Sequence, residues 1–249
     1  MKLALTTVLS FAVSAPIFAS TEVDETLTAT QSVWSPYFID NVSSPGVALE
    51  IVDAAFSCEG YSLAVTYMPW VRAFKTVSRN RADVVMGLWW SREREKTFAF
   101  SEPYLVNSLH LVSLGSTPLT NNDLFIDNLR VGSVTGYHYA DSFMANPKLV
   151  HHQSYRPIEL IEWLVKRRID GALIDKLTFE FYVNRLGYDI EEFFVNPKPF
   201  VEYPLHLAVN KMNPDADKII ADFNKGIQLI TETGLVDDIV LKYAQKTTD

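Results

Sequence analysis

Short apolar runs of strand length alternate along this chain with amphipathic segments of helical period. In the longer segments, apolar residues recur at the three- and four-residue spacing of one helix face. Strands that alternate with helices favour βα units, whose crossover connections make neighbouring strands parallel. The sequence therefore predicts an α/β fold with mostly parallel sheets flanked by helices. We expect strands at 26–33, 62–67, 83–88, 108–114, 129–134, 170–174 and 204–210, and helices at 47–57, 71–80, 138–145, 157–167, 176–186, 214–232 and 235–245.

One short pattern occurs twice and indicates two units of similar build. Residues 81–83 (RAD) and 168–170 (RID) each follow an amphipathic helix and precede a buried strand. The simpler alternative is that helix-to-strand turns favour such residues. Two lobes would each present strand ends to a shared cleft, and ligands of open α/β sheets bind beyond the carboxyl ends of strands. The residues at those ends are Gly87, Leu88, Trp89, Ile174 and Asp175.

Residues 1–19 form a separate apolar block with the pattern of a secretory signal peptide. Lys2 is the only charged residue in this block, and cleavage is expected after Ala19. An uncleaved membrane anchor is the alternative, which the short length and the interrupting Ser, Thr and Pro residues disfavour. The residue directly after the cleavage site is Ser20 and not a cysteine, so we expect no lipid anchor and a periplasmic location.

Charge and motif content exclude several classes of function. The chain has 30 acidic and 22 basic residues, which disfavours broad binding to nucleic acid. The motifs of serine hydrolases, zinc proteases, P-loop enzymes and dinucleotide-binding folds are absent. Cys58 is the single cysteine, so it has no internal disulfide partner, and we expect it to be an inert buried residue. We therefore expect no cofactor and no metal.

Residues 83–104, DVVMGLWWSREREKTFAFSEPY, carry the most specific pattern. They resemble the family 3 periplasmic solute-binding proteins, which deliver polar amino acids to ABC transporters. Members of that family have Gly-x-Thr-x-Thr-x-x-Arg after a buried strand, followed by Phe-Ser-x-Pro-Tyr. This chain has Gly87, Trp89, Ser91 and Arg94, followed by residues 100–104 (FSEPY). The resemblance continues in order at 34–37 (WSPY), 46–60, 131–136, 168–175 and 234–243.

The resemblance implies a two-lobed periplasmic-binding-protein fold of type II, with the ligand held between the lobes. Lobe 1 is then expected at 20–104 plus 206–249, and lobe 2 at 109–200. The chain would cross between them twice, near 104–108 and 200–205. Two strand-like crossings form a hinge that can absorb closure around a ligand.

By resemblance, two charged residues hold a dipolar ligand from opposite lobes. Arg94 would bind the α-carboxylate, because a guanidinium offers a planar fork that matches a carboxylate. Asp175 would take the α-ammonium, and as the residue after a buried strand it can also cap the next helix. The alternatives are a solvated helix arginine and a cap alone. A ligand that bridges both groups would favour the closed form.

Aromatic and turn residues would form the rest of this site. Trp34 and Trp70 match the two aromatic positions that enclose the ligand in the family, although either could be a core residue. Thr135 and Gly136 would supply a hydroxyl and backbone N–H groups at a strand-to-helix turn, or only a tight turn. Tryptophan walls suit an apolar, aromatic or cationic ligand side chain. The predicted site residues are Trp34, Trp70, Gly87, Trp89, Arg94, Thr135, Gly136 and Asp175.

Three positions depart from the family pattern and concern ligand identity. Trp89 stands where the family has a small hydroxyl residue, so it would shrink the pocket or change the ligand pose. Gln31 stands where many members have an acidic residue, and Gly132 where some have a basic or polar one. An α-amino acid is expected, with a dipeptide, a polyamine-like molecule or another small carboxylate as alternatives.

These observations predict a monomeric periplasmic binding protein for a small zwitterionic or carboxylate ligand, without enzymatic activity. Its partner would be an inner-membrane ABC permease, or a membrane receptor if the chain serves as a sensor. The family also includes cyclohexadienyl dehydratases, so an enzyme on the same scaffold is the alternative. Such an enzyme would need a general acid or base in the cleft. The candidates for that group are Asp175, His138 and Glu202.

Overall fold

The computed structural model describes residues 25–137 and 139–246 as an α/β fold. The predicted signal peptide, residues 1–19, and His138 lie outside the described residues. The longer strands are β1 (Glu25–Gln31), β2 (Tyr61–Tyr67), β3 (Val84–Trp89), β5 (Leu105–Leu114), β6 (Leu129–Val134), β7 (Leu149–Ser154), β8 (Gly171–Asp175) and β10 (Val201–Asn210). Two short strands are β4 (Phe98–Phe100) and β9 (Phe193–Val195). The α-helices are α1 (Val47–Ser57), α2 (Trp70–Ser78), α3 (Asp141–Met144), α4 (Pro157–Val165), α5 (Lys176–Leu186), α6 (Ala216–Glu232) and α7 (Leu235–Lys246).

All the described strands belong to one hydrogen-bonded sheet, in which eight strands follow the order β2-β1-β3-β10-β5-β8-β6-β7. The strands at both ends of this path are parallel, as predicted: β1 pairs with β2 and β3, and β6 pairs with β7 and β8. The joins in the middle are antiparallel, through β10 and β5. The short strands β4 and β9 pair with β10 and β5.

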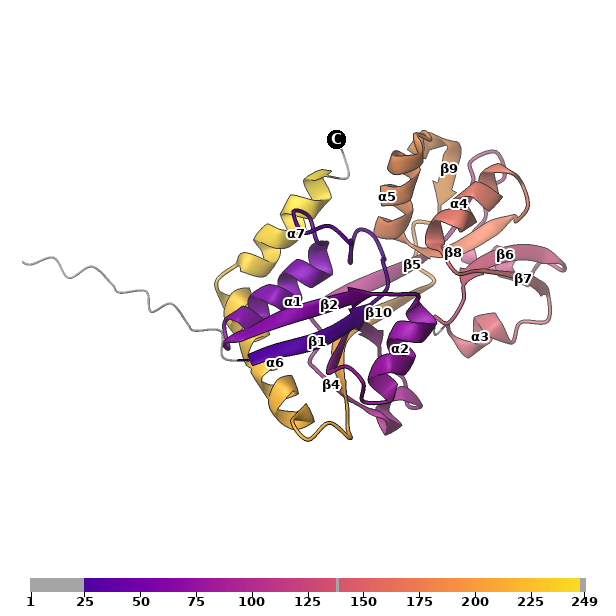
Figure 1. The fold of residues 1–249 in the computed structure, drawn as a ribbon. Coiled ribbons are helices and arrows are strands. Elements are labelled where there is room, and N and C mark those ends of the chain that lie inside the picture. Colours follow the sequence, from indigo (N-terminus) through magenta and orange to yellow (C-terminus); the bar gives the residue numbers. More distant parts are fainter. Residues whose placement is uncertain (1–24, 138, 247–249) are drawn as a thin grey trace, which may run out of the picture.

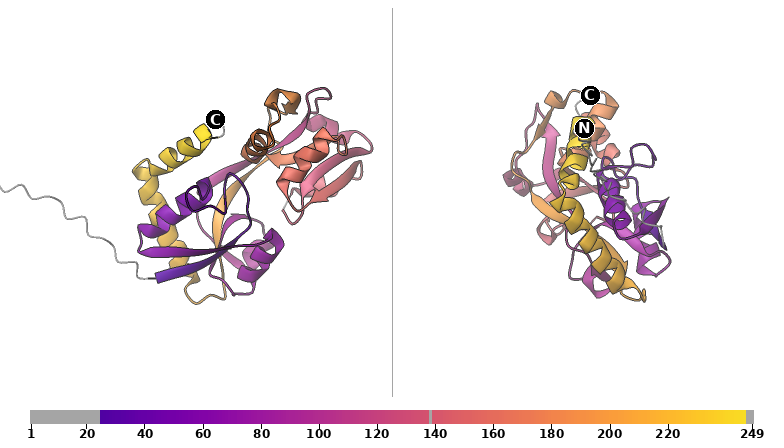
Figure 2. Two further views of the ribbon diagram at one scale, coloured as in Figure 1. Left: turned by 45° about the horizontal axis from the view of Figure 1, so that its top comes forward. Right: turned by 90° about the vertical axis from the view of Figure 1, so that its left-hand side faces the viewer.

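The elements form two groups that the long strands β5 and β10 connect (Figures 1 and 2). Lobe 1 contains β1–β4 with α1, α2, α6 and α7, and lobe 2 contains β6–β9 with α3, α4 and α5. β5 and β10 pair with each other from Leu105↔Leu205 to Leu109↔Val201. The predicted crossings at 104–108 and 200–205 fall in this stretch, and their action as a hinge stays a prediction.

The repeated RAD and RID segments make the same contact in each lobe. Asp83, just before β3, accepts hydrogen bonds from the backbone N–H (2.8 Å) and the hydroxyl (2.6 Å) of Thr28 on β1. Asp170, just before β8, accepts from the backbone N–H (2.9 Å) and the guanidinium of Arg130 on β6. The backbone N–H groups of Asp83 and Asp170 also donate to Thr28 and Arg130, respectively. Each aspartate therefore joins its strand to the parallel neighbour, which gives the repeat a structural role.

The core of lobe 1 lies between its sheet and helices α1, α6 and α7. Phe56 of α1 packs against Phe223 of α6, with ring centroids 5.1 Å apart, and both side chains are fully buried. Burial of a side chain of this size stabilises the fold by about 1.5–3 kcal/mol. Cys58, predicted to be buried, is exposed, because it is the residue that ends α1 rather than part of its apolar face.

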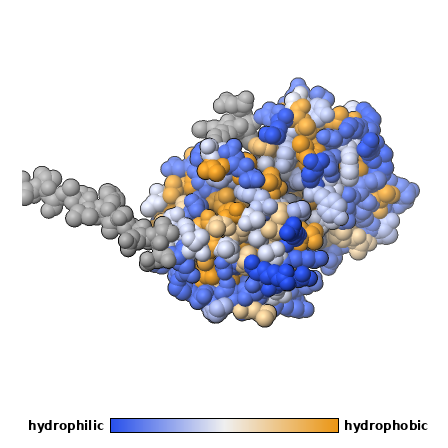
Figure 3. All heavy atoms as spheres, in the orientation of Figure 1, coloured by the Kyte–Doolittle hydropathy of each residue, from blue (hydrophilic) through white to orange (hydrophobic). Residues whose placement is uncertain are grey.

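Strands β4, β7 and β9 were not predicted, and the other differences lie at the ends of elements. β5 and β10 are longer than predicted, because they continue through the crossing between the lobes. The helix predicted at 138–145 is the single turn α3. Figure 3 shows a face where hydrophilic residues predominate, with smaller hydrophobic areas between them. No helix in the described part of the chain has the length and apolar character needed to span a membrane.

Candidate ligand-binding site

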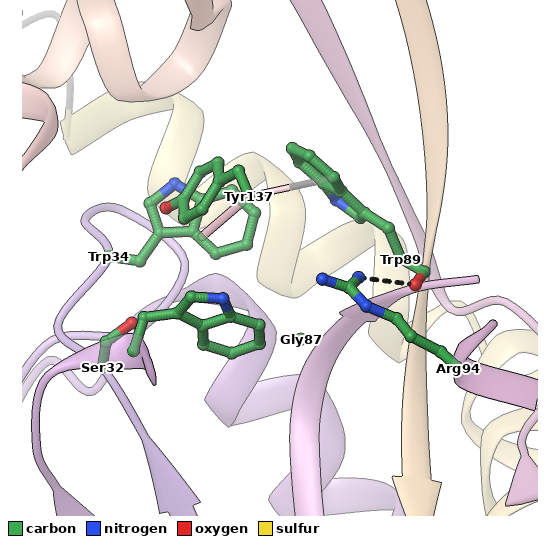
Figure 4. A pocket seen from close by; sticks show the side chains of 7 residues that line it. Ser32, Trp34, Gly87, Trp89, Arg94 and Tyr137 are labelled. Atoms are coloured by element: carbon green, nitrogen blue, oxygen red, sulfur yellow. Dashed lines mark hydrogen bonds between the residues drawn. The ribbon is translucent and has the colours of Figure 1, made fainter. Parts of the chain in front are cut away.

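Five of the predicted site residues surround one small cavity between the lobes (Figure 4). Its volume is about 10 Å³, which is room for about one water molecule. Lobe 1 supplies most of the wall, from the loop after β1, the start of α2, strand β3 and the short 3-10 helix Arg94–Lys96. The lining residues are Ser32, Trp34, Trp70, Gly87, Trp89, Arg94 and Tyr137.

Arg94 brings a positive charge to this cavity. Its guanidinium Nη1 donates to the backbone oxygen of Trp89 over 2.9 Å (Figure 4) and lies 5.4 Å from the centre of the Phe74 ring. Burial lowers the pKa of Arg94 to about 10, so the group stays protonated at neutral pH. Among the described residues, Arg94 forms no ion pair. The guanidinium therefore keeps hydrogen-bond donors for an anionic group of a ligand.

The three cavity tryptophans are held by hydrogen bonds from their indole N–H groups. Trp34 donates to the hydroxyl of Thr178 (2.9 Å) and Trp70 to the backbone oxygen of Gly136 (3.0 Å), so both reach from lobe 1 into lobe 2. Trp89 donates to the side-chain oxygen of Asn107 (2.8 Å). It also stacks on Tyr203, with ring centroids 4.5 Å apart. Satisfied indole groups fix the ring orientations, which leaves the ring surfaces to form the walls.

Tyr137 is a lining residue that sequence reasoning missed. Its ring meets Trp34, Trp70 and Trp89 edge to face, with centroid distances of 5.6, 6.4 and 5.3 Å. It follows Gly136, whose φ of +82° belongs to the left-handed region that favours glycine. The turn predicted at Thr135 and Gly136 was the available signal for this segment. Lobe 2 therefore places one aromatic ring among the tryptophans of lobe 1.

Asp175 does not line the cavity, but it contacts Thr178, which accepts the hydrogen bond of the lining residue Trp34. Its carboxylate caps α5, as the sequence suggested, by accepting from the backbone N–H of Thr178 over 2.9 Å. Both carboxylate oxygens also accept from the hydroxyl of Tyr37 in lobe 1, at 3.1 Å. Burial raises the pKa of Asp175, and the hydrogen bonds from Thr178 and Tyr37 offset only part of this rise. The resulting pKa is about 6. Thr135 also lies outside the lining and donates its backbone N–H to Ser154.

The raised pKa of Asp175 gives a pH dependence of stability with a defined sign. An aspartate has a pKa of about 3.9 in an unfolded chain, so the folded protein holds this proton more tightly between about pH 4 and 6. The free energy of unfolding should fall as pH rises through that window, relative to an Asp175→Asn variant. The expected change is roughly 2–3 kcal/mol, at about 1.4 kcal/mol per pKa unit. Urea unfolding of both proteins at pH 4 and pH 7 measures it, and an equal difference at both pH values would contradict it.

Two glycines of the family comparison have packing reasons: Gly87, which matches the family pattern, and Gly132, which departs from it. A Cβ at Gly87 would lie 2.7 Å from the Phe38 ring and 2.9 Å from the Gln31 amide nitrogen, so a side chain does not fit in this wall. A Cβ at Gly132 would lie 2.7 Å from the end of the Ile169 side chain, so this side chain would have to shift to admit the basic or polar residue of other family members. Gln31 is fully buried behind the cavity.

The candidate residues for acid–base catalysis do not meet at this cavity in the described residues. Glu202 is an exposed residue of β10 that accepts a hydrogen bond from Ser108 over 3.0 Å. Neither Glu202 nor Asp175 is among the lining residues, and His138 is not described. The described residues also contain no cluster of three or more potential metal ligands.

Comparisons with known proteins identify the family of this chain. A membrane-bound lytic murein transglycosylase F from Desulfosudis oleivorans is 26% identical over 226 residues, covering 86% of this chain but 47% of the relative, so the chain spans about half the length of that protein. An ancestral arginine-binding protein bound to arginine has the same fold, with a TM-score of 0.75 at 19% identity and coverage of 88% and 97% of the two chains. A substrate-binding protein of an ABC uptake transporter from Streptococcus pneumoniae, with bound histidine, has a TM-score of 0.75 at 20% identity, with 88% and 92% covered. The sequence model of one family matches residues 28–246, and the chain therefore belongs to the bacterial extracellular solute-binding proteins, family 3.

Proposed function

We propose that this chain captures a small amino-acid-like ligand in the cavity between its lobes and delivers it to an inner-membrane ABC permease. The observation that carries the proposal is the protonated, partly buried guanidinium of Arg94 at a cavity walled by tryptophans. A charged group in such surroundings is costly to keep without an ionic partner. A ligand carboxylate is the partner that fits its planar donors.

The aromatic walls would bind the rest of the ligand. Trp34, Trp70 and Trp89 present ring surfaces that favour an apolar or aromatic group. The family resemblance makes Asp175 the expected receptor for an ammonium group, but Tyr37 already donates to both of its oxygens. A ligand ammonium can therefore reach Asp175 only by competing with the Tyr37 hydroxyl.

Ligand entry would require the lobes or the lining side chains to move, because a cavity of about 10 Å³ does not hold an amino acid. Lobe separation would break the hydrogen bonds of Trp34 and Trp70 to lobe 2, and closure would restore them around the ligand. A ligand drives closure only through contacts that it makes better in the closed form. Contacts to both lobes have that property.

The proposed cellular setting is the periplasm, with residues 1–19 as the export signal. The same cleft could serve a membrane receptor instead of a permease, and a monomer suffices for either role. An enzymatic role has less support, because no carboxylate or histidine is among the described lining residues. A general acid or base has to lie within hydrogen-bond reach of the reacting group.

A thermal-shift screen against a library of small metabolites tests this proposal. Ligands that bind only the folded state raise the melting temperature, by the equivalent of about 2.7 kcal/mol at a concentration 100 times the Kd. We expect a shift from at least one small carboxylate and none from nucleotides or metal ions. A library rich in amino acids and their carboxylate relatives that leaves the melting temperature unchanged would contradict the proposal.

A further inference from the structure

The charges around the cavity are unequal. Arg94 is the one charged residue among the described lining residues. The acidic group expected to balance it, Asp175, is 4% exposed and is bonded to Tyr37 and Thr178 instead. The described wall of the cavity therefore carries a receptor for an anion and no carboxylate, and Glu93 lines the adjoining pocket instead.

Tyr37 is held in place by its backbone. Its carbonyl oxygen accepts from the N–H groups of Ala48 (3.0 Å) and Leu49 (3.3 Å) in the first turn of α1. The chain passes so close that a Cβ on Gly46 would lie 2.4 Å from this oxygen. The ring is 2% exposed and packs on Trp34 with centroids 4.8 Å apart. The hydroxyl is thus a fixed donor of lobe 1, positioned in advance for the carboxylate of lobe 2.

We infer that the ligand is a small aromatic carboxylate without an α-ammonium group, and that Tyr37 determines this preference by occupying Asp175. The inference rests on the proposed function and names the ligand class of the same site. Tyr37 takes the place that an ammonium group would have on Asp175. Closure of the lobes over Asp175 then needs no amine from the ligand.

The ring of Tyr137 supports the aromatic part of this inference. It lies among Trp34, Trp70 and Trp89 and meets all three rings edge to face. The three tryptophans therefore already accommodate one planar six-membered ring. A ligand ring that takes this place as Tyr137 moves aside keeps the same kind of contact. Its carboxylate then lies near Arg94, which lines the same cavity (Figure 4).

An α-amino acid would be the weaker ligand for a physical reason. Its ammonium group must leave water, and the described lining residues offer it ring faces but no carboxylate. To reach Asp175 it must displace the Tyr37 hydroxyl, which in this buried place is left with only the neighbouring Asn107 side chain. A carboxylate without the amine avoids both costs.

Calorimetry with matched pairs of probes tests the inference. The pairs are L-tryptophan with indole-3-propionate and L-phenylalanine with 3-phenylpropionate, which differ only by the α-ammonium group. We expect the wild-type protein to bind the deaminated member of a pair at least about 10-fold more tightly, the size of one good charge-assisted hydrogen bond. Tighter binding of the amino acid would overturn the inference.

Variants of Tyr37 separate its role from general packing. Tyr37→Phe removes only the hydroxyl and frees Asp175, so the preference should shift by about 10-fold or more toward the amino acid. In the Tyr37→Phe/Asp175→Asn double variant, the preference should return to the wild-type side, because the freed group has no charge. Tyr139→Phe is the matched control: its buried hydroxyl accepts from Val134 over 2.8 Å and does not contact Asp175, so it should leave the preference unchanged.

The outcomes distinguish this inference from the proposed function. An unchanged preference in folded Tyr37→Phe overturns the role of Tyr37. No binding of any of the four probes overturns the aromatic ligand class. In that case, a hit in the metabolite screen would still support a solute-binding role, whereas silence there as well would remove the proposed function itself.

Discussion

Replacement of Arg94 by alanine should abolish measurable binding of the ligand that the metabolite screen identifies. The guanidinium is the one charged group that the described residues place on the cavity wall, and it forms no ion pair with another described residue. Loss of a paired, charge-assisted interaction with a carboxylate should weaken binding at least about 100-fold, or about 3 kcal/mol. Titration calorimetry of wild type and Arg94→Ala measures the change.

Two further variants make this result specific. Arg94→Lys keeps the charge but loses the planar fork, so it should recover only part of the affinity. Arg92→Ala is the matched control, because it removes an exposed arginine two positions away that lies outside the cavity. Equal affinity of wild type and Arg94→Ala would show that the carboxylate is bound elsewhere, and an equal loss in Arg92→Ala would show a general effect of positive charge.

Sequence periodicity predicted most of the fold, because most elements are set by local pattern. The helices predicted at 47–57 and 176–186 have the bounds of α1 and α5. The short strands β4 and β9 were missed, since three residues are too few for a period and their partners lie far away in the chain. Strand β7 was also missed, because only its first two residues are apolar and its buried positions do not alternate. The extension of β5 and β10 through the crossing likewise depends on pairing between distant segments.

The part of the site that lobe 1 alone contributes was predictable from the sequence. Trp34, Trp70 and Arg94 were identified by their resemblance to family positions in lobe 1, and the structure brings them to one cavity. Tyr37 and Tyr137 were missed, although Tyr37 belongs to the WSPY segment that the sequence singled out. Their significance comes from contacts between lobes, to Asp175 and to the tryptophans, which no spacing in the sequence encodes. The competition between Tyr37 and a ligand amine is visible only in three dimensions.

The placement of Tyr37 depends in turn on the packing of α1 against α6, which a single glycine permits. A Cβ at Gly226 of α6 would lie 2.1 Å from the backbone oxygen of Ala55 and 2.8 Å from its carbonyl carbon. Backbone atoms of α1 cannot rotate away as a side chain could, so the two helices would have to separate. α1 begins at Val47, beside the turn that holds Tyr37, so such a shift would disturb the site as well as the core.

Gly226→Ala should therefore lower the free energy of unfolding by about 3 kcal/mol or more, at the upper end of the range for overpacked cores. Alanine gains about 1 kcal/mol over glycine from helix propensity, which is too little to offset the clash. Gln228→Ala, on the exposed side of the same helix, should change the stability by less than about 0.5 kcal/mol. Urea unfolding followed by circular dichroism measures both variants. A Gly226→Ala protein as stable as wild type would contradict the close contact between Gly226 and the backbone of Ala55.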